Sequence, residues 1–356
     1  MSEKILVVGD MHIGARSASP IVMEHQLKYM ENVLFPLIEK HNIKQILQLG
    51  DLFDTRKFSN HLILHTWKKR FFKVLRDLNV EFITLLGNHD TFYKNTNEVN
   101  TTSLFLSEFD NIVVIDKPTE MKLAKTNFLL LPWICSENRE EVLKAIEKST
   151  SLYCAGHLEF SGFEMHPGQI ASSGEDVSLF EKFDTVFSGH YHTKSHKGNI
   201  FYTGIPYELT WIDYNDSKGI FIFDTDKLEL EYVKNENPLF VKVVYNDDEK
   251  KDDYWKYIDL SKVSNSYVKL IVTKKTNPYQ FDKLVDKIIS LEPIELKILD
   301  ELDDFEDVEL GEKEIETVDT NTLIESFVEK TDTDLDKNKI TNIIKTLYIE
   351  AIHLGA

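Results

Sequence analysis

Six short apolar runs in the first half of the chain constrain its fold more than any other feature. They read KILVVG, QILQLG, EFITLLG, NFLLLPW, SLYCAG and TVFSG, and begin at residues 4, 45, 81, 127, 151 and 185. Because apolar and polar residues do not alternate in them, they predict β-strands that are covered on both faces. Between the early runs, apolar residues recur at intervals of three and four over 23–37 and 64–78, as in amphipathic helices. Strands that alternate with helices in this way predict a layered α/β domain.

Five of the six runs end in a glycine that is followed at once by a residue able to bind a metal. These strand ends are Gly9-Asp10 with His12, Gly50-Asp51, Gly87-Asn88-His89, Gly156-His157, and Gly189-His190 with His192. Ligands of open α/β sheets bind in the crevice beyond the carboxyl ends of the strands, so these side chains are expected to converge there. Glycine lets the chain turn sharply and approach a ligand closely.

Each of these motifs has a simpler explanation when it is taken alone. Asp10 and Asp51 could cap helices, and Asn88 is an ordinary turn residue. The histidines could be solvated or hydrogen-bonded rather than liganded. Their number argues against these explanations, because several uncompensated polar groups in one crevice would be costly to desolvate. A binuclear metal centre accounts for all of them.

The types of donor group indicate which metals and which reaction to expect. Imidazole nitrogens with carboxylate and amide oxygens, and no thiolate, suit manganese, iron or zinc rather than a structural zinc cage or a calcium loop. Two cations about 4 Å apart need a bridging ligand, and a carboxylate such as Asp51 can give one oxygen to each. Centres of this kind hydrolyse phosphoesters, because they activate a water and offset the charge of the phosphoryl oxygens.

Composition limits where and how such a chain can act. The net charge of −19 argues against a protein that coats nucleic acid by bulk electrostatics, although it does not exclude a nuclease. Cys135 and Cys154 lie in apolar segments, which suits buried thiols in a reducing compartment. The apolar run at the amino terminus is too short for a secretory signal, and no stretch approaches about 20 apolar residues. We therefore expect a cytoplasmic protein without a membrane span.

The second half of the chain predicts smaller units. The runs at 219–224 and 228–233 are expected to finish the sheet. The turn-forming pair Asn237-Pro238 then indicates the start of a smaller unit. Strands are expected at 239–245, 267–273 and 294–299, with a helix from Phe281 to Leu291. Residues 300–316 carry ten carboxylates and one lysine, as in a solvated linker. Helices at about 320–330 and 336–353 follow, and their apolar stripe either docks on a partner or folds back on the second unit.

The motifs together resemble a known family. D-x-H at 10–12, G-D at 50–51, G-N-H-D at 87–90, G-H at 156–157 and G-H-x-H at 189–192, in this order, resemble the calcineurin-like metallophosphoesterases. Within that superfamily, GDLFDTRK, LLPW and GHLEFSGF are most similar to the SbcD-type DNA repair nucleases, especially the recombination endonuclease subunits of large tailed bacteriophages. The similarity covers essentially the whole chain.

The resemblance implies a fold and a division of the chain. The fold is α/β, a layered metallophosphoesterase β-sandwich flanked by helices, with a small α+β capping domain and a C-terminal helix pair. The implied divisions are a nuclease domain at 1–236, a DNA-capping domain at 237–299, an acidic linker at 300–316 and a helical partner-binding motif at 317–356.

The resemblance also implies roles for the strand-end residues. The implied ligands are Asp10, His12, Asp51 and His192 for one metal, and Asp51, Asn88, His157 and His190 for the other. His89 matches the family histidine that contacts the scissile phosphate and helps the leaving oxygen depart. Asp54 stands where many relatives carry a second catalytic histidine, so Asp54 is a further catalytic candidate.

The implied activity is manganese-dependent exonuclease action on duplex DNA and endonuclease action on single strands, in DNA recombination and repair. The implied partners are DNA, an SbcC-like ATPase with a long coiled coil, and a second copy of the chain, giving a heterotetramer. Candidate contacts with DNA phosphates are Arg16, Arg56, Lys57, Lys194 and Lys197, although for any one of them a solvated surface position is the more common explanation. Candidate contacts with the ATPase are Leu323, Ile324, Phe327, Ile340, Ile344 and Leu347. The alternatives are a phosphatase of small molecules or proteins on the same scaffold, and an inactive scaffold for the ATPase.

Overall fold

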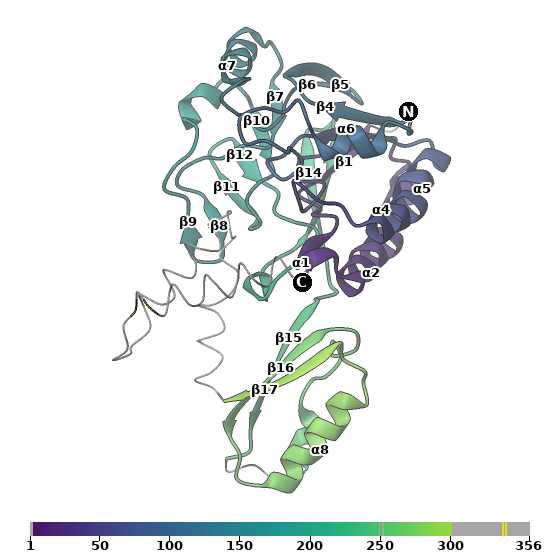
Figure 1. Ribbon diagram of the computed structural model, residues 1–356, viewed down its shortest axis with the longest axis vertical. Coiled ribbons are helices and arrows are strands. Elements are labelled where there is room, and N and C mark those ends of the chain that lie inside the picture. Colours follow the sequence, from purple (N-terminus) through teal and green to yellow (C-terminus); the bar gives the residue numbers. More distant parts are fainter. Residues whose placement is uncertain (1–2, 249, 251–252, 301–336, 338, 340–356) are drawn as a thin grey trace. The chain divides into compact units, whose positions relative to one another are not determined.

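Two six-stranded mixed sheets form the centre of the computed structural model (Figure 1). The first has the order β14 (Glu229–Lys234), β13 (Gly219–Asp224), β1 (Lys4–Val8), β2 (Gln45–Gln48), β3 (Glu81–Leu85) and β4 (Ile112–Ile115). The second has the order β11 (Ser195–Lys197), β12 (Ile200–Tyr202), β10 (Thr185–Ser188), β7 (Tyr153–Gly156), β6 (Thr126–Leu131) and β5 (Thr119–Leu123). The six predicted apolar runs form β1, β2, β3, β6, β7 and β10, and the runs after residue 218 finish the first sheet, as expected.

The strands are buried on both faces, which confirms the interpretation of their continuous apolar character. In β1, Ile5 and Val7 belong to the core between the two sheets, together with Phe128 and Phe187 of the second sheet. Leu6 and Val8 point to the opposite face and pack in a second core with the helices. The architecture is therefore a sandwich of two sheets within a mixed α/β fold.

The outer face of the first sheet is covered by two long helical segments. One consists of α2 (Pro20–Tyr29), η1 (Met30–Leu34) and α3 (Phe35–His41), and the other of α4 (His61–Trp67), η2 (Lys68–Phe72) and α5 (Lys73–Asp77). In each segment a five-residue π-helical turn joins two α-helical parts. The predicted helices over 23–37 and 64–78 are thus confirmed.

Shorter elements complete the sandwich. They are α1 (Ala15–Ala18), α6 (Thr101–Leu106), α7 (Arg139–Lys148), the hairpin of β8 (Glu164–His166) and β9 (Gln169–Ile170), and the turns η3 (Val177–Phe180) and η4 (Trp211–Asp213). Val142 and Ile146 of α7 pack against the outer face of the second sheet, where Cys154 is also buried. Cys135 and Cys154 are both buried free thiols, as expected. Among the described helices, none has the length and apolar character needed to cross a membrane.

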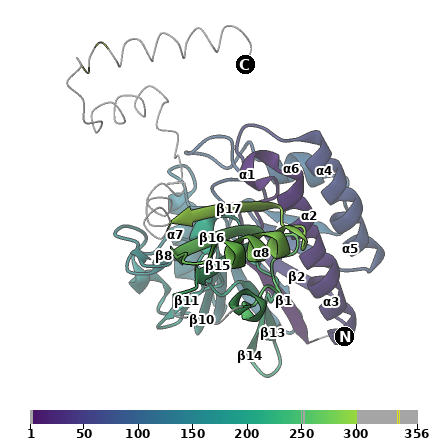
Figure 2. The same ribbon diagram turned by 90° about the horizontal axis from the view of Figure 1, so that it is seen from below.

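A smaller unit with its own core follows β14, the last strand of the first sheet along the chain. It contains β15 (Phe240–Asn246), η5 (Tyr254–Tyr257), β16 (Tyr267–Lys274), α8 (Pro278–Ile289) and β17 (Glu295–Asp300). The three strands are parallel in the order β15-β16-β17, and α8 lies along this sheet (Figure 2). The helix predicted to begin at Phe281 begins at Pro278, because the Asn277 side chain accepts a hydrogen bond from the Gln280 backbone N–H and proline suits the first turn.

The structure describes residues 3–248, 250, 253–300, 337 and 339. The described residues up to 300 belong to one compact unit that ends at Phe305. The acidic linker beyond residue 300 and, apart from Lys337 and Lys339, the helix pair predicted for 317–356 lie outside the described residues. So do the six predicted partner contacts, Leu323, Ile324, Phe327, Ile340, Ile344 and Leu347.

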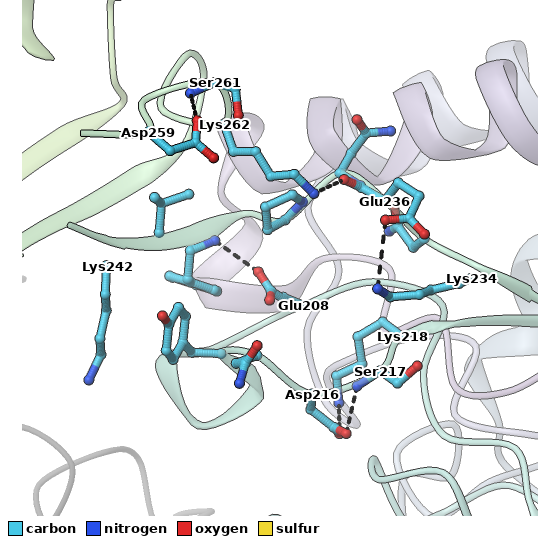
Figure 3. Close-up of a pocket in the computed structure, with 17 residues that line it drawn as sticks. Glu208, Asp216, Ser217, Lys218, Lys234, Glu236, Lys242, Asp259, Ser261 and Lys262 are labelled. Carbon is cyan, nitrogen blue, oxygen red and sulfur yellow. Dashed lines mark hydrogen bonds and ion pairs between the residues drawn. The ribbon is translucent and has the colours of Figure 1, made fainter. Parts of the chain in front are cut away.

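Glu208, between β12 and η4, is hydrogen-bonded to the start of the small unit. Its side chain lines a cavity of about 550 Å³ (Figure 3). One carboxylate oxygen accepts hydrogen bonds from the backbone N–H groups of Leu239 and Phe240, at 2.7 and 2.8 Å. Burial outweighs these two bonds and raises the pKa of Glu208 from 4.5 to about 7. The folded protein therefore binds a proton at Glu208 more tightly than the unfolded chain does.

We expect Glu208→Gln to remove one component of the pH dependence of stability. A raised carboxyl pKa contributes stability that is complete below about pH 4.5 and is lost as the pH rises to about 7. The variant keeps an oxygen for the two N–H groups but has no charge to bury. Urea unfolding gives the free energy of unfolding of both proteins at pH 5 and pH 8. Between these pH values, the stability of Glu208→Gln relative to the native chain should rise by on the order of 3 kcal/mol. Glu236→Gln, at an exposed residue of the same cavity, is the control, and an equal pH dependence of all three proteins would contradict the expectation.

Candidate metal centre

The carboxyl ends of five strands from both sheets meet at one edge of the sandwich. β1, β2 and β3 are parallel neighbours in the first sheet, and β7 and β10 are parallel neighbours in the second. The loops that follow them carry the seven predicted ligands, which are Asp10, His12, Asp51, Asn88, His157, His190 and His192. All seven are buried or half-buried, so the structure brings together side chains that are up to 182 positions apart in the sequence.

Asp10, His12 and His192 form one group of donor atoms, all within 4.8 Å of one another. The Nε2 atoms of His12 and His192 are 3.1 Å apart, so both rings face the same point. The Asp10 carboxylate accepts the backbone N–H of His190 at 3.0 and 3.1 Å, which orients it. This group has the nitrogen and oxygen donors expected for one of the two metals.

Asp51, His157 and His190 form the second group within 4.8 Å. His157 Nε2 lies 3.4 Å from Asp51 Oδ2. The amide oxygen of Asn88 lies 2.9 Å from His157 Nε2 and 3.1 Å from His190 Nδ1, so Asn88 completes this group. Nδ1 of His157 is 2.8 Å from the Leu49 carbonyl oxygen. Its N–H donates there and leaves Nε2 free to act as a metal ligand.

The backbone at the centre is strained. His12, Asp51 and His190 have φ values of +44°, +50° and +84°, in the left-handed region that favours glycine. Such conformations cost roughly 1–3 kcal/mol each and persist where surrounding contacts determine them, most often at functional sites. Gln26, buried in α2, supplies two of these contacts, because its amide donates to the carbonyl oxygens of Met11 and His12.

The charges at the centre require positive counter-charge. Asp10 and Asp51 are 0% and 2% exposed, and burial raises the pKa of Asp10 to about 7. Burial lowers the pKa of His12 and His157, but the surrounding carboxylates outweigh burial and raise the two pKa values to about 10 and 9. These imidazolium protons occupy positions that a metal cation can take instead. The donor set, its burial and its demand for cations all fit a pair of divalent metals.

The chain matches the family of calcineurin-like phosphoesterases over residues 3–194, which is more than half of its length. It belongs to the calcineurin-like phosphoesterase family. Exonuclease subunit 1 of Enterobacteria phage T4 is 30% identical over 98% of this chain and 99% of the phage protein. DNA double-strand break repair protein Mre11 of Sulfurisphaera tokodaii is 26% identical over 54% of this chain and 49% of the archaeal protein. The family predicted from the five motifs is thus confirmed.

Beside the two donor groups, this phosphoesterase has a third cluster, which consists of Asp54, His89 and His12. The ring nitrogen Nδ1 of His89 is 2.6 Å from the Asp54 main-chain oxygen, so its N–H donates there and Nε2 remains available. The Asp54 carboxylate is 3.3 Å from Nδ1 of His12. Asp54 therefore contacts His12 through its side chain and His89 through its main chain.

The five cations predicted to contact DNA lie in different surroundings. Arg16 lies 5.8 and 5.2 Å from the ring centres of Phe240 and Tyr267, and Lys194 lies 4.0 Å from that of Tyr232. Lys57 lies 6.0 Å from the ring centre of Phe92, and Lys197 is exposed. The Nη1 atom of Arg56 is buried without a hydrogen-bond partner among the described residues.

Several residues at the centre were given no role in the sequence analysis, although Asp90 belongs to the G-N-H-D motif and Trp133 to LLPW. The buried Asp90 carboxylate accepts the backbone N–H groups of Leu52, Phe53 and Gly87, and so joins two of the ligand loops. The Trp133 ring lies 5.3 Å from the His190 ring. Trp133 ends the one apolar run of the six that lacks a glycine and a metal-binding residue. Its place at the end of that strand was the signal that it lies near the centre. His166, on the β8–β9 hairpin, forms a further group with His192 and Asp213, for which the sequence offered no signal.

The glycines at the strand ends are required by close approach. A Cβ atom on Gly87 would overlap the Asp51 carboxylate and main-chain nitrogen. We therefore expect Gly87→Ala to lower the free energy of unfolding by about 1–3 kcal/mol and to weaken manganese binding at least tenfold, because Asp51 must move. Denaturant unfolding and equilibrium dialysis measure the two effects. Gly168→Ala, where nothing lies within 4 Å, should leave metal binding unchanged, and equal metal affinity of both variants would contradict the expectation.

Proposed function

We propose that this chain is the nuclease subunit of an ATPase–nuclease complex that processes DNA ends in recombination and repair, in the cytoplasm. Its activity would be manganese-dependent exonuclease action on duplex DNA and endonuclease action on single strands. The observation that carries the proposal is the convergence of two nitrogen and oxygen donor groups beside Asp51. The relation to a phage exonuclease subunit over 98% of the chain supports DNA as the substrate.

The two metals would be held by residues of this chain alone. Asp10, His12 and His192 would bind one, Asn88, His157 and His190 the other, and Asp51 would contribute to both. Manganese is proposed because the donors are of the borderline and hard types that suit it. When bound, the metal pair would supply an activated water and positive charge opposite the phosphoryl oxygens.

Side chains beside the donor groups would bind and orient the substrate. Nε2 of His89 would contact the scissile phosphate and protonate the leaving oxygen, since its other nitrogen is held by the Asp54 main-chain oxygen. The Asp54 carboxylate would fix the ring of His12, and we propose this orienting role for it in place of direct proton transfer. Arg56 would bind a backbone phosphate, because it is half-buried two positions after Asp54 of the third cluster.

The rest of the chain would serve DNA and partner binding. We propose a nuclease domain at 1–236, a DNA-capping domain at 237–299, a linker at 300–316, and a helix pair at 317–356 that binds an SbcC-like coiled-coil ATPase. The separate core of the small unit supports the division between residues 236 and 237. A homodimer, and with the ATPase a heterotetramer, is supported by two exposed apolar side chains. Phe58, in the loop before α4, is 81% exposed, and Leu62, in the first turn of α4, is 58% exposed.

The proposal is tested with purified chain, manganese and duplex DNA labelled at its ends. We expect nucleotides to be released by the native chain and not by His89→Ala. Hydrolysis of a chromogenic phosphoester without DNA cleavage would indicate a phosphatase instead. Inactivity toward both substrates, with the ATPase present, would indicate a scaffold subunit.

The partner is tested separately. The native chain and a chain that ends at residue 316 would each be mixed with the ATPase and analysed by size-exclusion chromatography. Co-elution of the native chain alone is expected, and co-elution of both would overturn the assignment of residues 317–356.

A further inference from the structure

Lys218, directly before β13, carries a positive charge into the interior near the metal centre. Its side chain is 3% exposed. Its ammonium lies 2.8 Å from Asp213 Oδ1 and 2.8 Å from Asp216 Oδ2, the second of which is drawn in Figure 3. It also donates a hydrogen bond to the main-chain oxygen of His192 at 2.9 Å. Two of its three N–H donors thus form hydrogen bonds, to Asp216 and to the His192 main chain, and Asp213 adds an ion pair.

The three partners of Lys218 connect two segments. His192 lies in the loop after β10, whereas Asp213 ends η4 and Asp216 lies in the turn between η4 and β13. Asp213 closes a capping box at η4, which fixes that turn. The Thr193 hydroxyl donates to Asp216 at 3.2 Å and ties the loop to the same turn. Lys218 therefore fastens the His192 loop to a segment with hydrogen bonds of its own.

We propose that Lys218 is a positioning residue for His192, and through it for one metal only. The inference rests on the metal pair of the proposed function. Within the ligand loop, Lys218 holds the carbonyl of His192, two residues beyond the strained backbone of His190. His157, in the second group, is held instead by the Leu49 carbonyl. Loss of Lys218 should therefore weaken the metal at Asp10, His12 and His192 and spare the other.

The alternative is that Lys218 only neutralises two buried carboxylates. Lys218→Met alone would leave Asp213 and Asp216 without their cation, so it risks unfolding the protein. Lys218→Met combined with Asp216→Asn removes one charge of each sign. Asp216→Asn alone is the matched control, because it leaves the bond from Lys218 to the His192 carbonyl in place.

The test is manganese binding by the full chain without DNA, followed by electron paramagnetic resonance and equilibrium dialysis. The native chain and Asp216→Asn should bind two ions with a spin-coupled signal. In the double variant we expect one ion to bind within threefold of the native affinity and the other at least tenfold more weakly, which leaves a single-ion signal over a wide range of manganese concentration.

The outcomes separate the inference from the function on which it rests. If the native chain binds no pair of ions, the proposed function fails. If the native chain binds a pair and the double variant binds it equally well, or loses both ions equally, only the role of Lys218 fails. Should the double variant not fold, Lys218→Arg takes its place, since its planar fork keeps the charge but changes the donor directions. In Lys218→Arg, the affinity for one ion should then fall at least threefold more than the affinity for the other. An equal change in both affinities would overturn the inference.

Discussion

Replacement of Asp51 by asparagine is expected to lower the rate of manganese-dependent DNA cleavage by at least about three orders of magnitude. Asp51 is 2% exposed, lies against His157 in the second donor group, and is the proposed ligand of both metals. An amide keeps an oxygen for the His89 backbone N–H, which Asp51 accepts at 2.8 Å, but it removes the negative charge. A loss of about 4 kcal/mol in stabilisation of the transition state corresponds to a factor of 10³.

The Asp51 variant needs two measurements. Release of labelled nucleotides gives the rate, and equilibrium dialysis gives the number of bound ions, which we expect to fall below two. Asp77→Asn, at a side chain that is 63% exposed, is the matched control and should be unchanged. A variant of Asp51 that binds two ions and cleaves DNA at the native rate would show that Asp51 bridges nothing.

Replacement of His89 by alanine is expected to lower cleavage by about 10² to 10⁴, with manganese affinity changed less than threefold. Cleavage should fall far more than manganese affinity, because His89 donates to the Asp54 main-chain oxygen through Nδ1. This bond directs Nε2 away from that loop. His89 therefore acts on the substrate rather than on the metals. The same rate and dialysis measurements apply, with the exposed His65→Ala as control.

A loss of metal binding in the His89 variant would change the assignment. His89 belongs to a cluster with His12 and Asp54, so an equal loss of binding and cleavage would make it a ligand. A normal rate would exclude it from catalysis altogether.

The strand ends illustrate what could be predicted. Asp10, Asp51 and His157 follow apolar runs in a parallel arrangement, and parallel strands end at the same edge, so local pattern and topology together predict convergence. The sequence of motifs then predicted the family. β4 and β12 were not predicted, because each is short and its place depends on pairing with β3 or β10 rather than on its own residues.

The amino-acid sequence by itself determined the strand runs, the order of the motifs and the donor types, because apolar periodicity and side-chain chemistry are local properties. Only the tertiary structure decided which residues hold the donors in place. Asp90, Trp133 and Lys218 act through loops that are distant in the chain. Asp90 accepts main-chain N–H groups, Trp133 lies against the His190 ring, and Lys218 donates to a main-chain carbonyl. These contacts form only when distant segments meet in three dimensions, and no local pattern encodes such meetings.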